Sequence, residues 1–178
     1  HAKRVCNKLN RGDTSAVVLP FTVAAELHHW VTQAKSFRML QQEDAPTKRF
    51  FLFTDASKTG YGAVLIDPTQ QLRVLGGKWT DAEHALDIAA LEAKAVEHAA
   101  DTFLPDIKGR GHLSIRIDNS SVEAALRRGC ARSSNLNEHM LNVVEKFAQS
   151  DVPIDVDYVA SDRNPADAPS RGLEVKEL

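Results

Sequence analysis

The amino-acid sequence predicts an α/β fold in which helices pack on a mixed β-sheet. Three strand-like segments follow one another between residues 50 and 79 with only short breaks, which is typical of an antiparallel meander. From residue 83 onward helical and strand-like patterns alternate, which is typical of β-α-β units. The chain has 178 residues and no internal repeats, so it fits one such domain with a short additional segment.

The additional segment is expected at residues 1–46. Residues 1–17 are polar and basic and indicate a linker or the tail of a preceding unit. Apolar residues then recur at helical spacing in residues 21–37: Val23, Leu27, Trp30, Val31 and Ala34. The polar stretch 41–49 contains Pro46 and predicts a break. We therefore place the domain at residues 47–178.

The first three strands are expected at residues 50–56, 60–67 and 71–79. Both faces of the first strand are largely apolar, which predicts a central strand covered on both sides: Phe51, Phe53 and Asp55 on one face, and Phe50, Leu52 and Thr54 on the other. Gly60 is expected to permit the turn between the first two strands, and Gly62 to let a neighbouring backbone approach closely.

The later elements alternate in type. A long helix rich in Ala and Leu is expected near residues 83–103, and it should end before Pro105. A strand at 112–118 and another at 152–159 enclose two helices. These helices are expected at residues 120–129, where Gly129 ends the first, and at 134–149; a short helical turn within 164–172 closes the pattern.

Bulk composition excludes some classes of protein. Hydrophobic residues make up 43% and charged residues 26%, as in ordinary globular domains, and no apolar run approaches the ~20 residues that span a bilayer, so no membrane contact is expected. Cys6 and Cys130 lack the spacing of a disulfide scaffold or a zinc site. Reduced thiols and the absence of a signal-peptide core after His1 predict an intracellular protein, in the cytoplasm or nucleus, that is not secreted.

Four carboxylates stand where elements meet or where a buried face is expected. Asp55 ends the first strand, although turn residues at strand ends are commonly Asp. Glu92 falls within an apolar stripe of the long helix that consists of Ile88, Val96, Ala99 and Phe103. A carboxylate there is costly unless it is paired or binds metal; the alternative is that Glu92 lies at the edge of the stripe and reaches water.

The other two carboxylates begin helices. Asp118 follows the fourth strand, and the alternative is a helix cap, but Ser120 and Glu123 already offer a Ser-x-x-Glu capping box. Asp167 lies in the first turn of the last helix, with Asn164 as expected N-cap; a negative charge is favoured in that turn anyway.

The net charge of −2 and the pI near 6.4 do not by themselves indicate a nucleic-acid binder. A site with several carboxylates would, however, lower the net charge without removing local basic patches. Four carboxylates at one edge of a sheet repel one another unless cations lie between them, and oxygen ligands select hard ions such as Mg²⁺ or Mn²⁺. Two such ions can clamp the attacking and leaving oxygens of a phosphoryl displacement.

Four motifs resemble the ribonuclease H domain of retroelement reverse transcriptases. They are TDASKTGYGAVL at 54–65, LEAKAV at 91–96, IDNSSVEAAL at 117–126 and NPADAPSRG at 164–172. The resemblance runs from about residue 50 to residue 172, and the first and last motifs look most like LTR or tyrosine-recombinase retrotransposons. The segment around residues 27–30 is similar to the connection segment that joins polymerase to nuclease, so residues 1–46 are expected to be its linker and helical tail.

The resemblance implies a ribonuclease H-like fold, with a five-stranded mixed sheet made of an antiparallel meander plus parallel strands. It also implies cleavage of the RNA strand of RNA–DNA hybrids with two Mg²⁺, for which Mn²⁺ can substitute. By motif position, Asp55 would bridge both ions, Glu92 and Asp118 would complete one site, and Asp167 would hold the other. Implied partners are the hybrid and the adjacent reverse transcriptase domain; substrate contacts are expected from Ser57, Asn119, Ser120, Arg163, Asn164 and Arg171.

Two features depart from the resemblance. Many members of the family carry a histidine in the loop before the last aspartate, whereas residues 158–163 contain none. Cellular and bacterial members often insert a basic helix where this chain has only residues 127–134, which contain Arg127, Arg128 and Arg132. Substrate binding is therefore expected to depend mostly on partner domains.

Three other readings stay open at the level of sequence. Proofreading exonucleases have an Asp-x-Glu in the first strand, and Ser57 stands where that Glu would be. Integrases and transposases place the glutamate last, whereas Glu92 precedes Asp118. A catalytically inactive ribonuclease H-like domain that serves as a connection or scaffold is the third reading, and the presence of all four acids argues against it.

Overall fold

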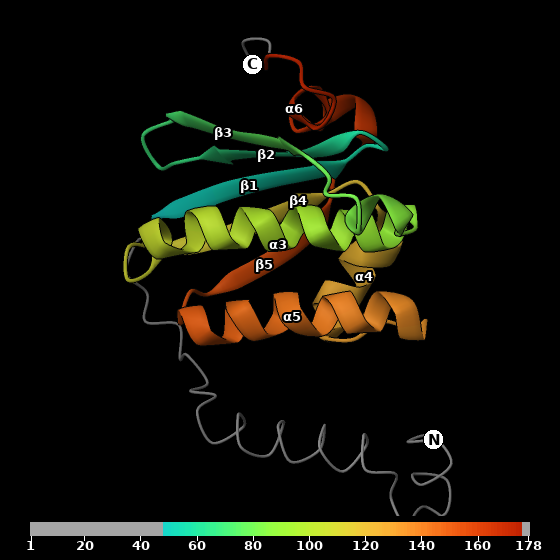
Figure 1. The fold of residues 1–178 in the computed structure, drawn as a ribbon. Helices are drawn as coiled ribbons and strands as arrows, with labels where there is room; N and C mark the ends of the chain where they lie inside the picture. The colour runs from blue at the N-terminus through green and yellow to red at the C-terminus, as the bar shows by residue number, and fades with distance from the viewer. Residues whose placement is uncertain (1–47, 176–178) are drawn as a thin grey trace, which may run out of the picture. The chain divides into compact units, whose positions relative to one another are not determined.

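The computed structural model describes residues 48–175, and it contains a sheet with helices on both faces. Predictions made for residues 1–47 lie outside the described residues, and the domain boundary at residue 47 stays a prediction. Figure 1 shows the elements in chain order: β1 (Arg49–Ala56), β2 (Gly60–Ile66), β3 (Leu72–Lys78), η1 (Glu83–Ala85), α3 (Ile88–Ile107), β4 (His112–Ile117), α4 (Ser120–Arg128), α5 (Ser134–Ser150), β5 (Ile154–Tyr158), η2 (Ser161–Arg163) and α6 (Asp167–Ser170).

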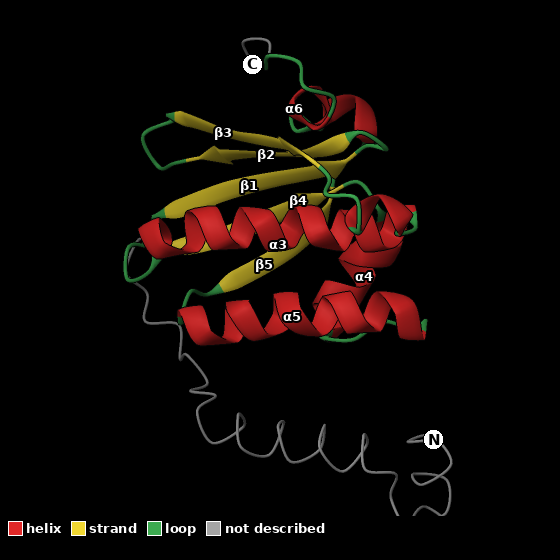
Figure 2. Cartoon of the chain, in the orientation of Figure 1, coloured by secondary structure: helices red, strands yellow, loops and turns green. Residues whose placement is uncertain are grey.

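The five strands form one mixed sheet in the order β3-β2-β1-β4-β5 (Figure 2). β1 pairs antiparallel with β2 and parallel with β4, while the outer pairs are antiparallel β2–β3 and parallel β4–β5. The predicted meander followed by parallel strands is thus confirmed, with β1 at the centre. Because Thr54 of β1 pairs with Ile117 of β4, the residues that follow them, Asp55 near the end of β1 and Asp118 just after β4, lie at the same edge of the sheet.

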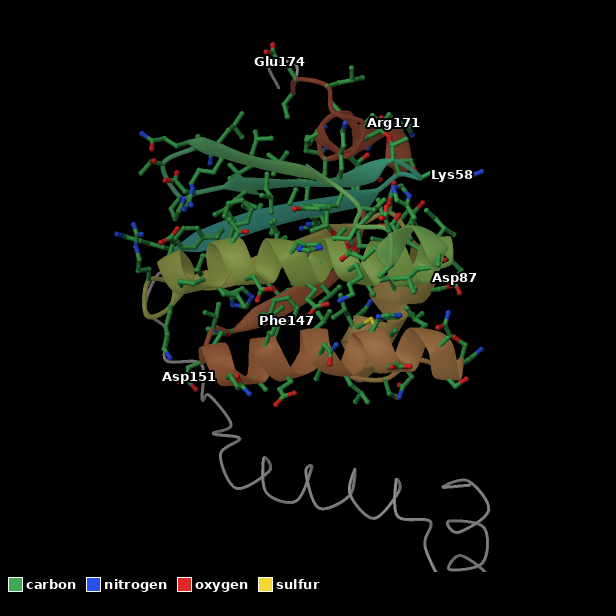
Figure 3. The ribbon with its side chains drawn as sticks, viewed as in Figure 1. Lys58, Asp87, Phe147, Asp151, Arg171 and Glu174 are labelled. Atoms are coloured by element: carbon green, nitrogen blue, oxygen red, sulfur yellow. The ribbon has the colours of Figure 1, made fainter. Side chains whose placement is uncertain are left out.

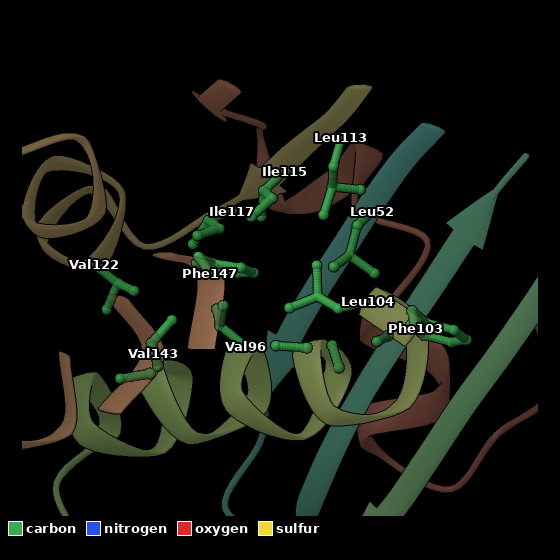
Figure 4. Packing of buried hydrophobic residues seen from close by; sticks show 14 of the residues in the cluster. Leu52, Val96, Phe103, Leu104, Leu113, Ile115, Ile117, Val122, Val143 and Phe147 are labelled. Atoms are coloured by element: carbon green, nitrogen blue, oxygen red, sulfur yellow. The ribbon is translucent and has the colours of Figure 1, made fainter. Parts of the chain in front are cut away.

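One face of the sheet carries the main core. Leu52, Leu113, Ile115 and Ile117 are fully buried there against α3 and α5, as Figure 4 shows. The α3 side of this contact consists largely of small residues, among them Ala93 and other alanines that are also fully buried. Small side chains let a helix axis lie close to the sheet, so α3 brings its polar residues within reach of the strand ends.

The opposite face is covered less completely than the sequence suggests. Phe51 and Phe53 are only partly buried, and the Arg116 guanidinium lies 5.9 Å from the centre of the Phe51 ring. The ends of β2 and β3 on this face are covered by α6. Within residues 48–175 no helix is both long enough and apolar enough to cross a membrane.

Both predicted ends of the long helix are wrong. Residues 83–85 form a separate 3₁₀ turn, and α3 begins at Ile88 because the Asp87 side chain caps it by accepting a hydrogen bond from the Ala90 amide at 2.9 Å. The helix also continues through Pro105 to Ile107. Proline inside a helix costs about 3 kcal/mol, whereas burying Leu104 and Ile107 contributes about 1.5–3 kcal/mol each, so the last turn is retained.

The two glycines of β2 meet close neighbours. The φ angle of Gly60 is not positive, so the expectation that it permits the turn is wrong; a Cβ on Gly60 would instead overlap the Gly77 carbonyl. The expectation for Gly62 is confirmed, because a Cβ there would overlap Ala166 O and Ser170 N at α6. Gly62 is therefore what allows α6 to lie directly on the sheet.

Gly62→Ala should lower the free energy of unfolding by about 1–3 kcal/mol, because the methyl group has to displace α6. Gly76→Ala is the matched comparison: Gly76 pairs with Gly62 across the strands, but its Cβ would lie 3.0 Å from Pro169 O, a looser contact. Urea denaturation of both variants measures the effect. A loss for Gly62→Ala no larger than that for Gly76→Ala would contradict this account.

Candidate active site

Asp55, Glu92 and Asp118 come together at the edge where β1 and β4 end. Asp55 is the seventh residue of β1, Glu92 lies in the second turn of α3, and Asp118 directly follows β4. One carboxylate oxygen from each residue lies within 4.8 Å of the other two. Three acids from three separate elements thus form one cluster, as the sequence predicts for these positions.

Burial distinguishes this cluster from an ordinary acidic surface. Only 5% of Asp55 and 5% of Glu92 is exposed, and Asp118 is partly buried. The Glu92 Oε2 atom is buried and forms no hydrogen bond with any described residue. The stripe that predicts a buried Glu92 is correct for Val96, Ala99 and Phe103, but Ile88 at its start is half-exposed. The alternative in which Glu92 reaches water is excluded.

The surroundings of two carboxyl groups shift their pKa values strongly upward. Burial raises the pKa of Asp55 to about 6; the charges of Asp118 and Asp167 add to the rise, and Ser170 and Arg171 oppose it. Burial, and then the charges of Asp55 and Asp118, raise the pKa of Glu92 to about 9, while the Ala56 amide opposes the rise by hydrogen bonding. Glu92 therefore retains a proton at neutral pH when no cation is present.

This arrangement fits a divalent cation. The Glu92 oxygen is buried without a partner, the neighbouring carboxylates repel it, and all three donors are hard oxygen ligands of the kind that Mg²⁺ and Mn²⁺ prefer. A bound ion would offset the repulsion and would give the Glu92 oxygen the partner that it lacks. Asp55, Glu92 and Asp118 are the residues that could hold it.

Asp167, the fourth predicted acid, lies outside this cluster. It is in the first turn of α6, as expected, and its charge acts on Asp55. Its Oδ1 atom accepts hydrogen bonds from Arg171 Nε at 2.9 Å and Nη2 at 2.8 Å. Asp167 is thus already paired with a cation, unlike the three clustered acids, and its predicted metal-binding role stays a prediction.

Two caps differ from the prediction. Asn119, not Ser120, caps α4: its side-chain oxygen accepts hydrogen bonds from the amides of Ser121 and Val122, so no Ser-x-x-Glu capping box forms. Asn164 does not cap α6 directly. It is buried, and its side chain donates to the Thr54 carbonyl at 2.9 Å and accepts from the Ala166 amide. Asn164 therefore connects the segment of residues 164–170 to β1.

The remaining predicted substrate residues occupy different environments. Ser57 is buried, and its hydroxyl lies 2.7 Å from the Ser170 carbonyl, to which it donates. Ser120 and Arg163 are exposed, and Arg171 is exposed on α6 while it pairs with Asp167. Because Ser57 and Asn164 are buried and bonded within the chain, the exposed positions are better placed for contact with a substrate; these roles stay predictions.

Two contacts that position the end of β1 have no signal in the sequence. Trp79 Nε1 donates to the Ser57 carbonyl at 2.8 Å, and the Ser57 side chain in turn binds α6 through Ser170. Burial has the largest effect on the pKa of Asp55 and raises it, and the Ser170 side chain opposes this rise. No local pattern in the sequence marks Trp79 or Ser170, because their partners lie far away along the chain.

A family model described as the RNase H-like domain found in reverse transcriptase matches residues 45–149, which is more than half of the chain. This chain belongs to that family. The match includes Asp55, Glu92 and Asp118 but ends before Asp167.

Solved structures show the same fold at low sequence identity. The N-terminal RNase H domain of a Mycobacterium tuberculosis protein is 16% identical with a TM-score of 0.57, and the match covers 70% of this chain and 98% of that one. RNase H1 from Halobacterium salinarum is 17% identical with a TM-score of 0.50, covering 68% and 92%. An RNase H1 isolated from compost, solved in complex with an RNA/DNA hybrid, is 12% identical with a TM-score of 0.54, covering 71% and 95%.

Among curated protein sequences, none matches this chain. The family and the fold are thus established by the family model and by the structural matches, while the chemistry has to be argued from the site itself.

Glu92→Gln should change how the stability of the metal-free domain depends on pH. An ordinary Glu ionises near pH 4.5, and in the folded protein the pKa of Glu92 is raised to about 9, so between these values the folded state holds a proton that the unfolded state has lost. Stability of the wild type therefore falls as pH rises through this window, and the amide removes that fall.

The free energy of unfolding of Glu92→Gln should exceed that of wild type by an amount that grows between pH 4.5 and pH 9 and reaches on the order of a few kcal/mol. Urea denaturation in the presence of a chelator measures this difference. Glu138→Gln, the same change at an exposed position of α5, is the control and should show no such growth. Parallel stability curves for wild type and Glu92→Gln would contradict the prediction.

Proposed function

We propose that this domain is a two-metal endonuclease that hydrolyses the RNA strand of RNA–DNA hybrids during reverse transcription. The observation that carries the proposal is the convergence of Asp55, Glu92 and Asp118 with an unpartnered, buried Glu92 oxygen. Three repelling acids held together by a core are costly for a purely structural domain. The family of the chain, RNase H-like domains of reverse transcriptases, agrees with this chemistry.

Each acid of the candidate site has a proposed role in holding one or both ions. Bound Mg²⁺ or Mn²⁺ would supply a more acidic water and charge stabilisation for in-line displacement at phosphorus. Asp55, Glu92 and Asp118 would hold the first ion, and Asp55 with Asp167 the second. The burial of Asp55 and Glu92 would limit the access of bulk water to the ion and strengthen the electrostatic interactions beside it.

Recognition of the hybrid is proposed at the start of α4. Asn119 and Ser120 directly follow Asp118, and Ser120 is exposed. From this position they can reach the minor groove, in which 2′-hydroxyl groups mark an RNA strand. Arg163 and Arg171, both exposed, add positive charge near the last acid.

The setting of the domain is also a proposal. The motifs favour an LTR or tyrosine-recombinase retrotransposon polyprotein, with the adjacent reverse transcriptase domain as partner and the cytoplasm or nucleus as location. The order Glu92 before Asp118 favours this reading over an integrase-like nuclease. An inactive connection or scaffold domain is the remaining alternative.

Asp55→Asn and Asp118→Asn should each lower the rate of hybrid cleavage on the order of 1000-fold, because each removes a charge that stabilises the ion. The measurement is cleavage of a labelled RNA–DNA hybrid in Mg²⁺ or Mn²⁺, beside single-stranded RNA and duplex DNA. Asp162→Asn, at an exposed acid in η2, is the control and should retain activity. An inactive wild type would favour the scaffold, and cleavage of duplex DNA the integrase-like nuclease.

Divalent ions should also stabilise the folded domain in the absence of substrate. Mg²⁺ at about 100 times its dissociation constant adds about 2.7 kcal/mol to the free energy of unfolding of a protein that binds it only when folded. Thermal unfolding of wild type with and without Mg²⁺ measures this gain. Asp118→Asn should lose most of it and Asp162→Asn none, whereas an equal gain in all three proteins would place the ion elsewhere.

A further inference from the structure

Arg171 stands out because it is a cation placed at the candidate metal site. It lies one helical turn beyond Asp167, and its Nε and Nη2 atoms both donate to the same carboxylate oxygen, Oδ1, at 2.9 and 2.8 Å. Figure 3 shows Arg171 beside α6, at the same end of the molecule as Lys58 in the turn after β1. The guanidinium thus already supplies Asp167 with the positive charge that a divalent ion would otherwise supply.

The charge of Arg171 also reaches Asp55. Hydrogen bonding and charge from Asp167 raise the pKa of Arg171, and Asp55 adds to that rise. In the other direction, burial raises the pKa of Asp55, and Arg171 is among the groups that oppose this rise. Arg171 therefore interacts with both acids that are proposed to hold the second ion.

The pair between Arg171 and Asp167 is exchangeable. The side chains of Arg171 and Asp167 are 57% and 46% exposed, and ion pairs of this kind between exposed groups are weak. The cluster of Asp55, Glu92 and Asp118 differs, because within residues 48–175 none of its three carboxylates forms a salt bridge. A cation can enter that cluster without displacing a side-chain cation.

We propose that Arg171 competes with the second metal ion for Asp167, so that the two ions bind in sequence and the second binds weakly. The first ion enters the cluster of Asp55, Glu92 and Asp118, in which no described Lys, Arg or His pairs with the acids. The second has to displace Arg171 from Asp167 or bind beside its positive charge. This inference rests on the proposed two-metal function and makes Arg171 a positioning residue that sets the affinity of one ion.

The competition has a measurable size. A unit charge a few ångströms from a divalent ion weakens its binding by about 10-fold, even at the dielectric constant of water. Removing the charge of Arg171 should therefore tighten the weaker ion by about 10-fold and leave the tighter ion nearly unchanged. A role in the fold alone would weaken both ions or neither.

The test is titration of the full 178-residue chain with Mn²⁺, followed by electron paramagnetic resonance of the free ion and by calorimetry. Wild type should show one tighter and one weaker class of Mn²⁺-binding site. Arg171→Gln should strengthen the weaker class, and Arg171→Lys, which keeps the charge, should resemble wild type. Lys58→Gln removes an exposed positive charge from the neighbouring turn and should have a smaller effect than Arg171→Gln. Circular dichroism establishes that each variant is folded.

The outcomes separate this inference from the proposed function. If the weaker class of site is unchanged or lost in Arg171→Gln, the proposed competition is wrong. It is also wrong if Arg171→Lys binds Mn²⁺ in the same way as Arg171→Gln. Failure of the proposed function is a different result: wild type then has no tighter class, or that class survives in Asp118→Asn. A tighter class that disappears in Asp118→Asn, together with a strengthened weaker class in Arg171→Gln, supports both.

Discussion

The repulsion among three clustered acids, two of them buried and one partly buried, is the constraint around which this domain is built. Asp55, Glu92 and Asp118 would separate if the chain were free to relax, since burial and like charge raise the pKa values of Asp55 and Glu92. The core of α3 and α5 against β1 and β4 prevents this. Stability is thereby given up at a cluster that could hold a cation, as is common where function and stability compete.

The segment of residues 164–170, which carries Asp167, is held in a different way. It lies over Gly62 and is held by two hydrogen bonds. The Asn164 side chain donates to the Thr54 carbonyl, and the Ser57 hydroxyl donates to the Ser170 carbonyl. Its acid, Asp167, is half-exposed and paired with Arg171. The last acid thus differs from the buried cluster, because it is half-exposed and already has a cationic partner.

Much of this could be predicted from the sequence because local periodicity decides it. The alternation in β1 and the stripe around Glu92 identify a central strand and a buried acid. One error lies between two local candidates: Asn119, not Ser120, caps α4. A second arises where tertiary packing overrides local preference, because burial of Ile107 carries α3 through Pro105. The role of Gly60 is another such error, because the close approach of β3 to Gly60 cannot be read from one strand alone.

By itself the sequence determined which elements form, their order, and that Asp55, Glu92 and Asp118 stand at element ends or on a buried face. Only the tertiary structure decided that their oxygens lie within 4.8 Å and that Asp167 pairs with Arg171 instead of joining them. The reason is physical. Side-chain periodicity fixes directions within one element, whereas distances between elements follow from packing among residues far apart along the chain.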